Sequence, residues 1–84
     1  MNASDNNEMI EMIEMVKQKL GTPEVKERIS EEELYVLKLR FGVIDGNLYT
    51  LNDTGKLIGK SREKVRQIEA RALRKLGLKK LWSK

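Results

Sequence analysis

The sequence predicts an all-α fold, a small helical bundle of about five helices that ends in a helix-turn-helix. Its 84 residues suffice for one domain with a small core. Cap residues and glycines divide the chain into short segments, and within these the apolar residues recur at helical spacing. The last two segments are joined by a turn of about three or four residues that contains glycine, which is typical of a helix-turn-helix.

A first helix is predicted over about residues 5–20, where an apolar stripe precedes Gly21. Thr22 and Pro23 then suit the N-cap and first position of a short helix that ends near residue 29. We expect the stripe of the first helix to pack against the rest of the protein and to bind no cofactor. Its members are Met9, Met12, Ile13, Val16 and Leu20.

The segment "SEEE" predicts a third helix over residues 31–41. The Ser30 side chain can accept from the Glu33 amide while Glu33 reaches back, which forms a capping box. Three successive glutamates could also suggest a metal site, but in a first turn they complement the helix dipole, so we expect no bound metal. The apolar residues of this helix should form the centre of the core; they are Leu34, Val36, Leu37, Leu39 and Phe41.

The last two helices are predicted over residues 51–58 and 62–76, after a turn-rich loop at 42–49 that has room for only a short β-hairpin. Gly55 falls where the two helices must approach closely, and Gly59 makes the turn between them. The remaining signals are Thr50 with Asp53 at the first N-terminus, Ser61 at the second, and Gly77 as the stop. The tail could extend the last helix, with Leu78, Leu81 and Trp82 as packing residues.

Charge is distributed unevenly along the chain. Residues 1–42 carry a net charge of −3 and residues 43–84 carry +7, within a total of +4. The second half is therefore expected to bind an anion, although a basic face that is merely solvated would have the same composition.

Composition also limits the chemistry that the chain can perform. It has no Cys and no His, so disulfides, thiolate nucleophiles, imidazole bases and the usual zinc ligands are absent. No pair of nucleophile and base stands out, and we expect neither an enzyme nor a cofactor. No apolar run approaches the roughly 20 residues that span a bilayer, and the N-terminus lacks the pattern of a signal peptide, so a cytoplasmic protein without membrane contact is expected.

The outward face of the last helix carries groups that suit DNA bases. Its first residues, Arg62, Glu63, Arg66 and Gln67, can bond guanine, cytosine and adenine edges in a major groove. Glu63 favours specific base recognition, because DNA phosphates repel a carboxylate and non-specific attraction would not explain one among basic residues. Its carboxylate could instead stabilise the helix dipole. We assign phosphate contacts to Lys60, Ser61 and Lys64, and the buried face to Val65, Ile68, Ala72 and Leu76, with Leu73 at its edge.

Two stretches, "LYVLKLRFGVIDGNLYTL" and "SREKVRQIEARALRKL", make the chain resemble region 4 of bacterial RNA polymerase sigma factors of the primary, or housekeeping, type. The resemblance covers about residues 29–76. It implies recognition of the minus-35 promoter element in double-stranded DNA during transcription initiation. Base contacts would be made by Arg62, Glu63 and Gln67, and Arg66 would contact DNA at the edge of the site.

The resemblance also implies protein partners. Arg71 and Arg74 would lie where transcription activators touch the domain. Leu37 and Phe41 would belong to an apolar groove that receives the flap-tip helix of the RNA polymerase beta subunit, and anti-sigma proteins would compete for these surfaces. We expect one domain over residues 1–84, with an N-terminal helix in 1–21, the region 4-like part in 22–76 and a basic tail in 77–84.

Thr54 and Lys60 depart from the family pattern, which has aliphatic residues at both positions. We expect the Thr54 hydroxyl to bond a carbonyl of its own helix, and the Lys60 stem to cover the core while its amine seeks phosphate. Both changes should weaken the helix-turn-helix. They leave open a second hypothesis, a protein-interaction module that binds the polymerase flap or an anti-sigma protein with little DNA affinity of its own.

Overall fold

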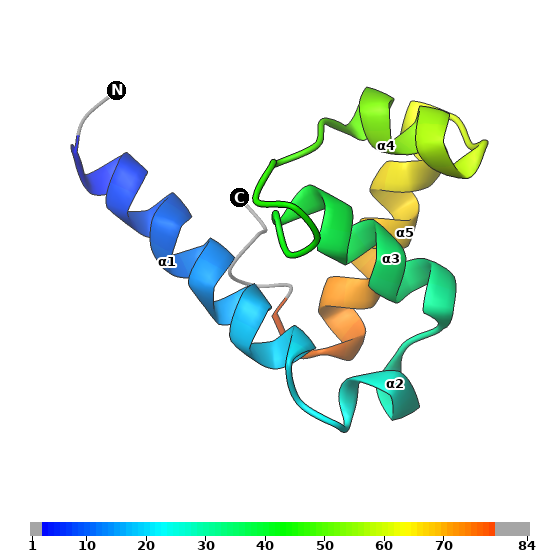
Figure 1. Cartoon of the computed structure of the whole chain (residues 1–84). Coiled ribbons are helices and arrows are strands. Elements are labelled where there is room, and N and C mark those ends of the chain that lie inside the picture. The colour runs from blue at the N-terminus through cyan, green and yellow to red at the C-terminus, as the bar shows by residue number, and fades with distance from the viewer. Residues whose placement is uncertain (1–2, 79–84) are drawn as a thin grey trace.

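The computed structural model describes residues 3–78, with side chains from residue 10 onward, and this part of the chain contains five helices and no strand. The prediction of an all-α bundle is therefore confirmed. The predicted role of Trp82 lies outside the described residues. The helices, in the order of Figure 1, are α1 (Ala3–Leu20), α2 (Val25–Arg28), α3 (Glu31–Arg40), α4 (Leu51–Ile58) and α5 (Arg62–Lys75).

Side-chain caps begin three of the helices as predicted. Ser30 and Glu33 form the capping box of α3, Thr50 accepts from the Asp53 amide at α4, and Ser61 accepts from the Lys64 amide at α5. Each cap satisfies an amide that has no partner within its helix, and so fixes where the helix starts.

The predicted N-cap of the second helix is wrong. The Thr22 hydroxyl donates to the Lys19 carbonyl at 2.8 Å, so it closes the end of α1 instead of opening α2. The short helix begins at Val25 and has no side-chain cap.

Glycine ends α5 close to the predicted stop. Gly77 adopts a φ of 76°, and the Leu78 amide reaches back to the Leu73 carbonyl at 2.8 Å. Leu73 and Leu78 lie in the same core cluster, as is usual for this type of helix end. The helix consequently does not continue through residues 77 and 78.

The core consists of two clusters. The larger one joins α1, α2, α3 and the C-terminal half of α5, and the smaller one joins α3, α4 and the start of α5. The larger comprises Met12, Val16, Leu20, Val25, Ile29, Leu34, Leu37, Phe41, Ala72, Leu73, Leu76 and Leu78. The smaller comprises Val36, Val65 and Ile68, with Leu51 and Ile58 against them.

The expected bond of the Thr54 hydroxyl is not formed. Thr54 is completely buried, and within the described part of the chain its Oγ1 atom has no hydrogen-bond partner. An unpaired buried hydroxyl costs about 1–3 kcal/mol, so this residue weakens α4 more than we expected from the sequence.

Two ion pairs connect α3 to α5. Arg40 Nε donates to Glu69 Oε1 at 2.6 Å, and Arg40 also donates to the Tyr49 carbonyl at 2.7 Å. Lys75 Nζ lies 3.1 Å from Glu33 Oε2. Burial acts to raise the pKa of Glu33, but the Ser30 amide and the Lys75 amine outweigh it and hold this pKa below its ordinary value.

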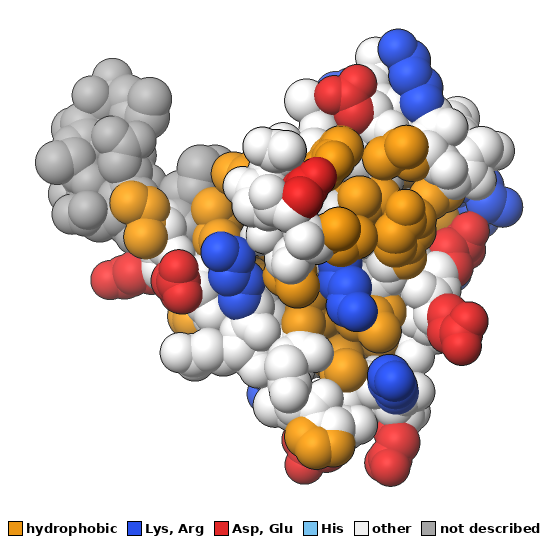
Figure 2. All heavy atoms as spheres, viewed as in Figure 1, with side chains coloured by type: hydrophobic (Ala, Val, Ile, Leu, Met, Phe, Trp, Pro, Cys, Tyr) orange, Lys and Arg blue, Asp and Glu red, His pale blue; other side chains and the backbone are white. Residues whose placement is uncertain are grey.

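The loop between α3 and α4 is a series of turns, and it contains no hairpin. The Asp45 carboxylate accepts from the Asn47 amide at 3.0 Å and from the Tyr49 hydroxyl at 2.6 Å. Figure 2 shows apolar side chains gathered over α3 and α4 on the visible face, and the exposed ones on these helices are Tyr35 and Leu57.

Candidate nucleic-acid interface

Close backbone contact sets the angle between α4 and α5. The Lys60 amide donates to the Gly55 carbonyl at 2.9 Å, and Gly59 turns the chain with a φ of 72°. A Cβ atom on Gly55 would lie 2.4 Å from the Lys60 carbonyl oxygen and 3.5 Å from Val65. The sequence-based reasons for Gly55 and Gly59 are therefore confirmed, and α4 and α5 form a helix-turn-helix.

The first turn of α5 lies at the end of the molecule away from α1 (Figure 1). The side chains predicted to contact bases or phosphates here are all exposed: Lys60, Ser61, Arg62, Glu63, Lys64, Arg66 and Gln67. The side chains predicted to face inward, from Val65 to Leu76, are buried. The structure thus turns the predicted contact groups from Lys60 to Gln67 outward together.

Glu63 and Arg66 bind each other on this exposed face. Arg66 Nε donates to both carboxylate oxygens of Glu63, at 3.1 and 3.2 Å. These bonds hold the pKa of Glu63 below its ordinary value and raise the pKa of Arg66. The Glu63 carboxylate is therefore paired with Arg66 in the free protein, and Arg62 and Gln67 lie near it.

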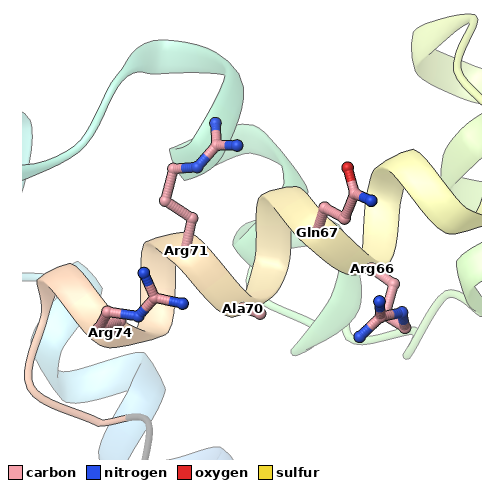
Figure 3. A pocket seen from close by; sticks show the side chains of 5 residues that line it. All are labelled: Arg66, Gln67, Ala70, Arg71 and Arg74. Carbon is pink, nitrogen blue, oxygen red and sulfur yellow. The ribbon is translucent and has the colours of Figure 1, made fainter.

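A shallow hollow of about 350 Å³ follows along α5. Figure 3 shows Gln67 and Arg71 leaving one side of the helix and Arg66 the other, with the short side chain of Ala70 between them. Arg74 completes its lining. Three guanidinium groups around a small residue can hold acidic or phosphate groups. Helical periodicity places Ala70 on the outward face of this helix, but no function was assigned to it from the sequence. Its small side chain leaves the space for the hollow.

Several basic side chains are already paired within the protein. The Lys60 amine lies 3.7 Å from the Glu32 carboxylate at the start of α3, and both side chains are largely exposed. Lys75 bonds to Glu33. No sequence signal indicated Glu32 as a partner, because its contact with Lys60 depends on how α3 meets the turn before α5.

The two residues that the resemblance assigns to an apolar groove, Leu37 and Phe41, are buried in this structure. Leu37 is 0% exposed and Phe41 is 3% exposed, and both share the larger core cluster with Met12, Val16 and Leu20 of α1. Neither side chain therefore forms open surface in this structure.

Among residues 3–78, no helix has the length and apolar character needed to cross a membrane. The same residues contain no group of three or more acidic side chains arranged to hold a metal ion.

The fold and the outward basic face define a helix-turn-helix domain. The profile of the family described as "Sigma-70, region 4" matches residues 27–77. The chain is also 49% identical over 63 residues to the RNA polymerase sigma factor SigA of a Bacillus species, a match that covers 75% of this chain. The chain therefore belongs to the sigma-70 region 4 family. It spans about 16% of the length of that relative.

Proposed function

We propose that the chain is a sequence-specific DNA-binding module that recognises a minus-35-type promoter element and docks on the RNA polymerase beta flap during transcription initiation. The observation that carries the proposal is the exposed first turn of α5, where Arg62, Glu63 and Gln67 stand together within the family segment. A helix-turn-helix presents these positions to base edges in the major groove.

Base and phosphate contacts divide along this surface. Arg62 suits guanine, Glu63 suits the cytosine amine and Gln67 suits adenine. Arg66, which pairs with Glu63 in the free protein, contacts DNA at the edge of the site. Phosphate contacts are assigned to Lys60, Ser61 and Lys64, around the N-terminus of α5 where its dipole favours anions.

Two further surfaces serve protein partners in this proposal. Arg71 and Arg74 line the basic hollow and would receive acidic groups of an activator. Leu37 and Phe41 belong to the face that would hold the polymerase flap helix, for which anti-sigma proteins would compete.

Glu63→Ala is expected to relax specificity at one base pair, because the carboxylate accepts from one base and contributes no attraction to phosphates. Lys64→Ala should instead weaken binding to all duplexes and reduce the slope of log K against log salt by about one. Anisotropy titrations against a panel of single-base promoter variants would compare the two. If Glu63→Ala keeps the wild-type ranking of all variants, Glu63 does not contact a base.

Two observations favour a second candidate, a protein-interaction module with little DNA affinity. The unpaired Thr54 hydroxyl lowers the stability of the helix-turn-helix, and Lys60 forms an exposed ion pair with Glu32. Under this hypothesis Arg62→Ala would leave binding to polymerase or to an anti-sigma protein unchanged in pull-down, and the wild-type chain would not prefer any duplex.

A further inference from the structure

Helix α1 packs its apolar stripe into the larger core cluster. Its Met12, Val16 and Leu20 recur every four residues and are 7%, 0% and 7% exposed. They share one cluster with apolar residues of α2, α3 and α5, which include Leu34, Leu37, Phe41, Leu73 and Leu76. Removing α1 would leave an apolar surface shaped to accept one amphipathic helix with this four-residue spacing.

Apolar contacts hold α1 to the domain, as they hold α2 and α4, whereas α3 and α5 are also joined to each other by ion pairs. Between the α1 side chains from residue 10 onward and the rest of the described chain, no hydrogen bond or ion pair is present. In contrast, Arg40 with Glu69 and Lys75 with Glu33 hold α3 to α5. Apolar contacts alone do not discriminate strongly between similar helices, so another helix with the same stripe can replace α1.

Helix α1 lies outside the segment that matches the family profile. The family segment begins at residue 27, after α1 has ended at Leu20 and the chain has turned. Figure 1 shows the N-terminal half of α1 extending away from the other helices. Ile10 and Met15, on α1, remain 58% and 43% exposed.

We propose that α1 is an exchangeable occupant of a helix-binding groove, and that an amphipathic helix of a partner protein docks by displacing it. The partner helix presents three apolar side chains at i, i+4 and i+8, as α1 does. Because α1 is tethered, it competes at high effective concentration and lowers the apparent affinity for the partner. The identity of the partner as the polymerase flap rests on the proposed function; the exchange of α1 does not.

The test uses the full-length chain and a fluorescent peptide with the sequence of residues 3–20 as probe. Val16→Asp places a charge in the groove and should release the resident helix, so the peptide should bind this variant at least about tenfold more tightly than the wild type. Met15→Asp is the matched control, because Met15 lies on the exposed side, and it should stay within about twofold of wild type. A peptide that itself carries Val16→Asp should not bind.

Three outcomes would overturn the proposal. If Val16→Asp abolishes cooperative unfolding in circular dichroism, α1 is a permanent part of the core. If Val16→Asp folds but binds the peptide no better than wild type, the groove does not accept a helix in trans. If the wild type sediments as a dimer and Val16→Asp does not, a second copy of this chain is the occupant. A fourth outcome concerns only the partner. If the Val16→Asp variant binds the α1 peptide but not a peptide of the flap helix, the flap is not the partner, and the exchange of α1 is not contradicted.

Discussion

Replacing Gly55 with alanine is expected to destabilise the domain by about 3 kcal/mol. The added Cβ would lie 2.4 Å from the Lys60 carbonyl oxygen, which is backbone and cannot rotate away. Relief requires α4 to move from the turn, which would break the bond from the Lys60 amide to the Gly55 carbonyl. For a domain of this size the midpoint of thermal unfolding should fall by more than about 10 °C.

Gly21→Ala provides the control for this measurement. A Cβ at Gly21 meets only ordinary contacts at 3.6 and 3.7 Å, and its backbone does not have a positive φ. Its stability should therefore remain within about 0.5 kcal/mol of wild type. Equal midpoints for the two alanine variants in thermal unfolding would show that the helices of the motif do not meet as closely as described.

Removing Glu69 is expected to have a comparable or larger effect. Glu69→Ala leaves the Arg40 guanidinium without its carboxylate in a site where the two side chains are only 17% and 3% exposed. Loss of one member of a buried ion pair typically costs about 3–5 kcal/mol. Urea unfolding followed by circular dichroism would measure this loss, which approaches the total stability expected of a small domain.

Two control variants distinguish the stability effect of the buried ion pair from that of an exposed one. The exposed pair of Glu32 with Lys60 provides a matched control, and Glu32→Ala should cost less than about 1 kcal/mol. The double variant Arg40→Met with Glu69→Leu should recover most of the stability, because no charge is then left unpaired. If Glu69→Ala costs no more than Glu32→Ala, the Arg40–Glu69 pair does not hold α3 against α5.

Local sequence signals predicted the helices well because the relevant physics is local. Ser30 and Ser61 cap their helices through amides three residues away, and Gly59 and Gly77 end theirs by adopting positive φ. The exception, Thr22, had two local partners open to it. Its hydroxyl donates to the Lys19 carbonyl of the preceding helix and does not accept from an amide of the following helix. The residue type alone does not distinguish these two bonds.

Contacts between distant segments were not predictable in the same way. Arg40 and Glu69 are 29 residues apart, and Lys75 and Glu33 are 42 apart, so no spacing rule connects them. The apolar stripe of α1 indicated a packed helix, but not which face it would cover. That Leu37 and Phe41 share a core cluster with the α1 residues follows only from the tertiary arrangement. The exposed first turn of α5 was predictable, since helical periodicity alone separates Glu63 and Gln67 from Val65 and Ile68.

The most direct test of the proposed function is fluorescence-anisotropy binding of the wild-type chain to a duplex with a minus-35-like hexamer and to a scrambled duplex, at two salt concentrations. Specific base contacts depend less on salt than phosphate contacts do. We predict a preference for the hexamer that persists at the higher salt. Equal binding to both duplexes that disappears as salt rises would contradict base recognition by Arg62, Glu63 and Gln67.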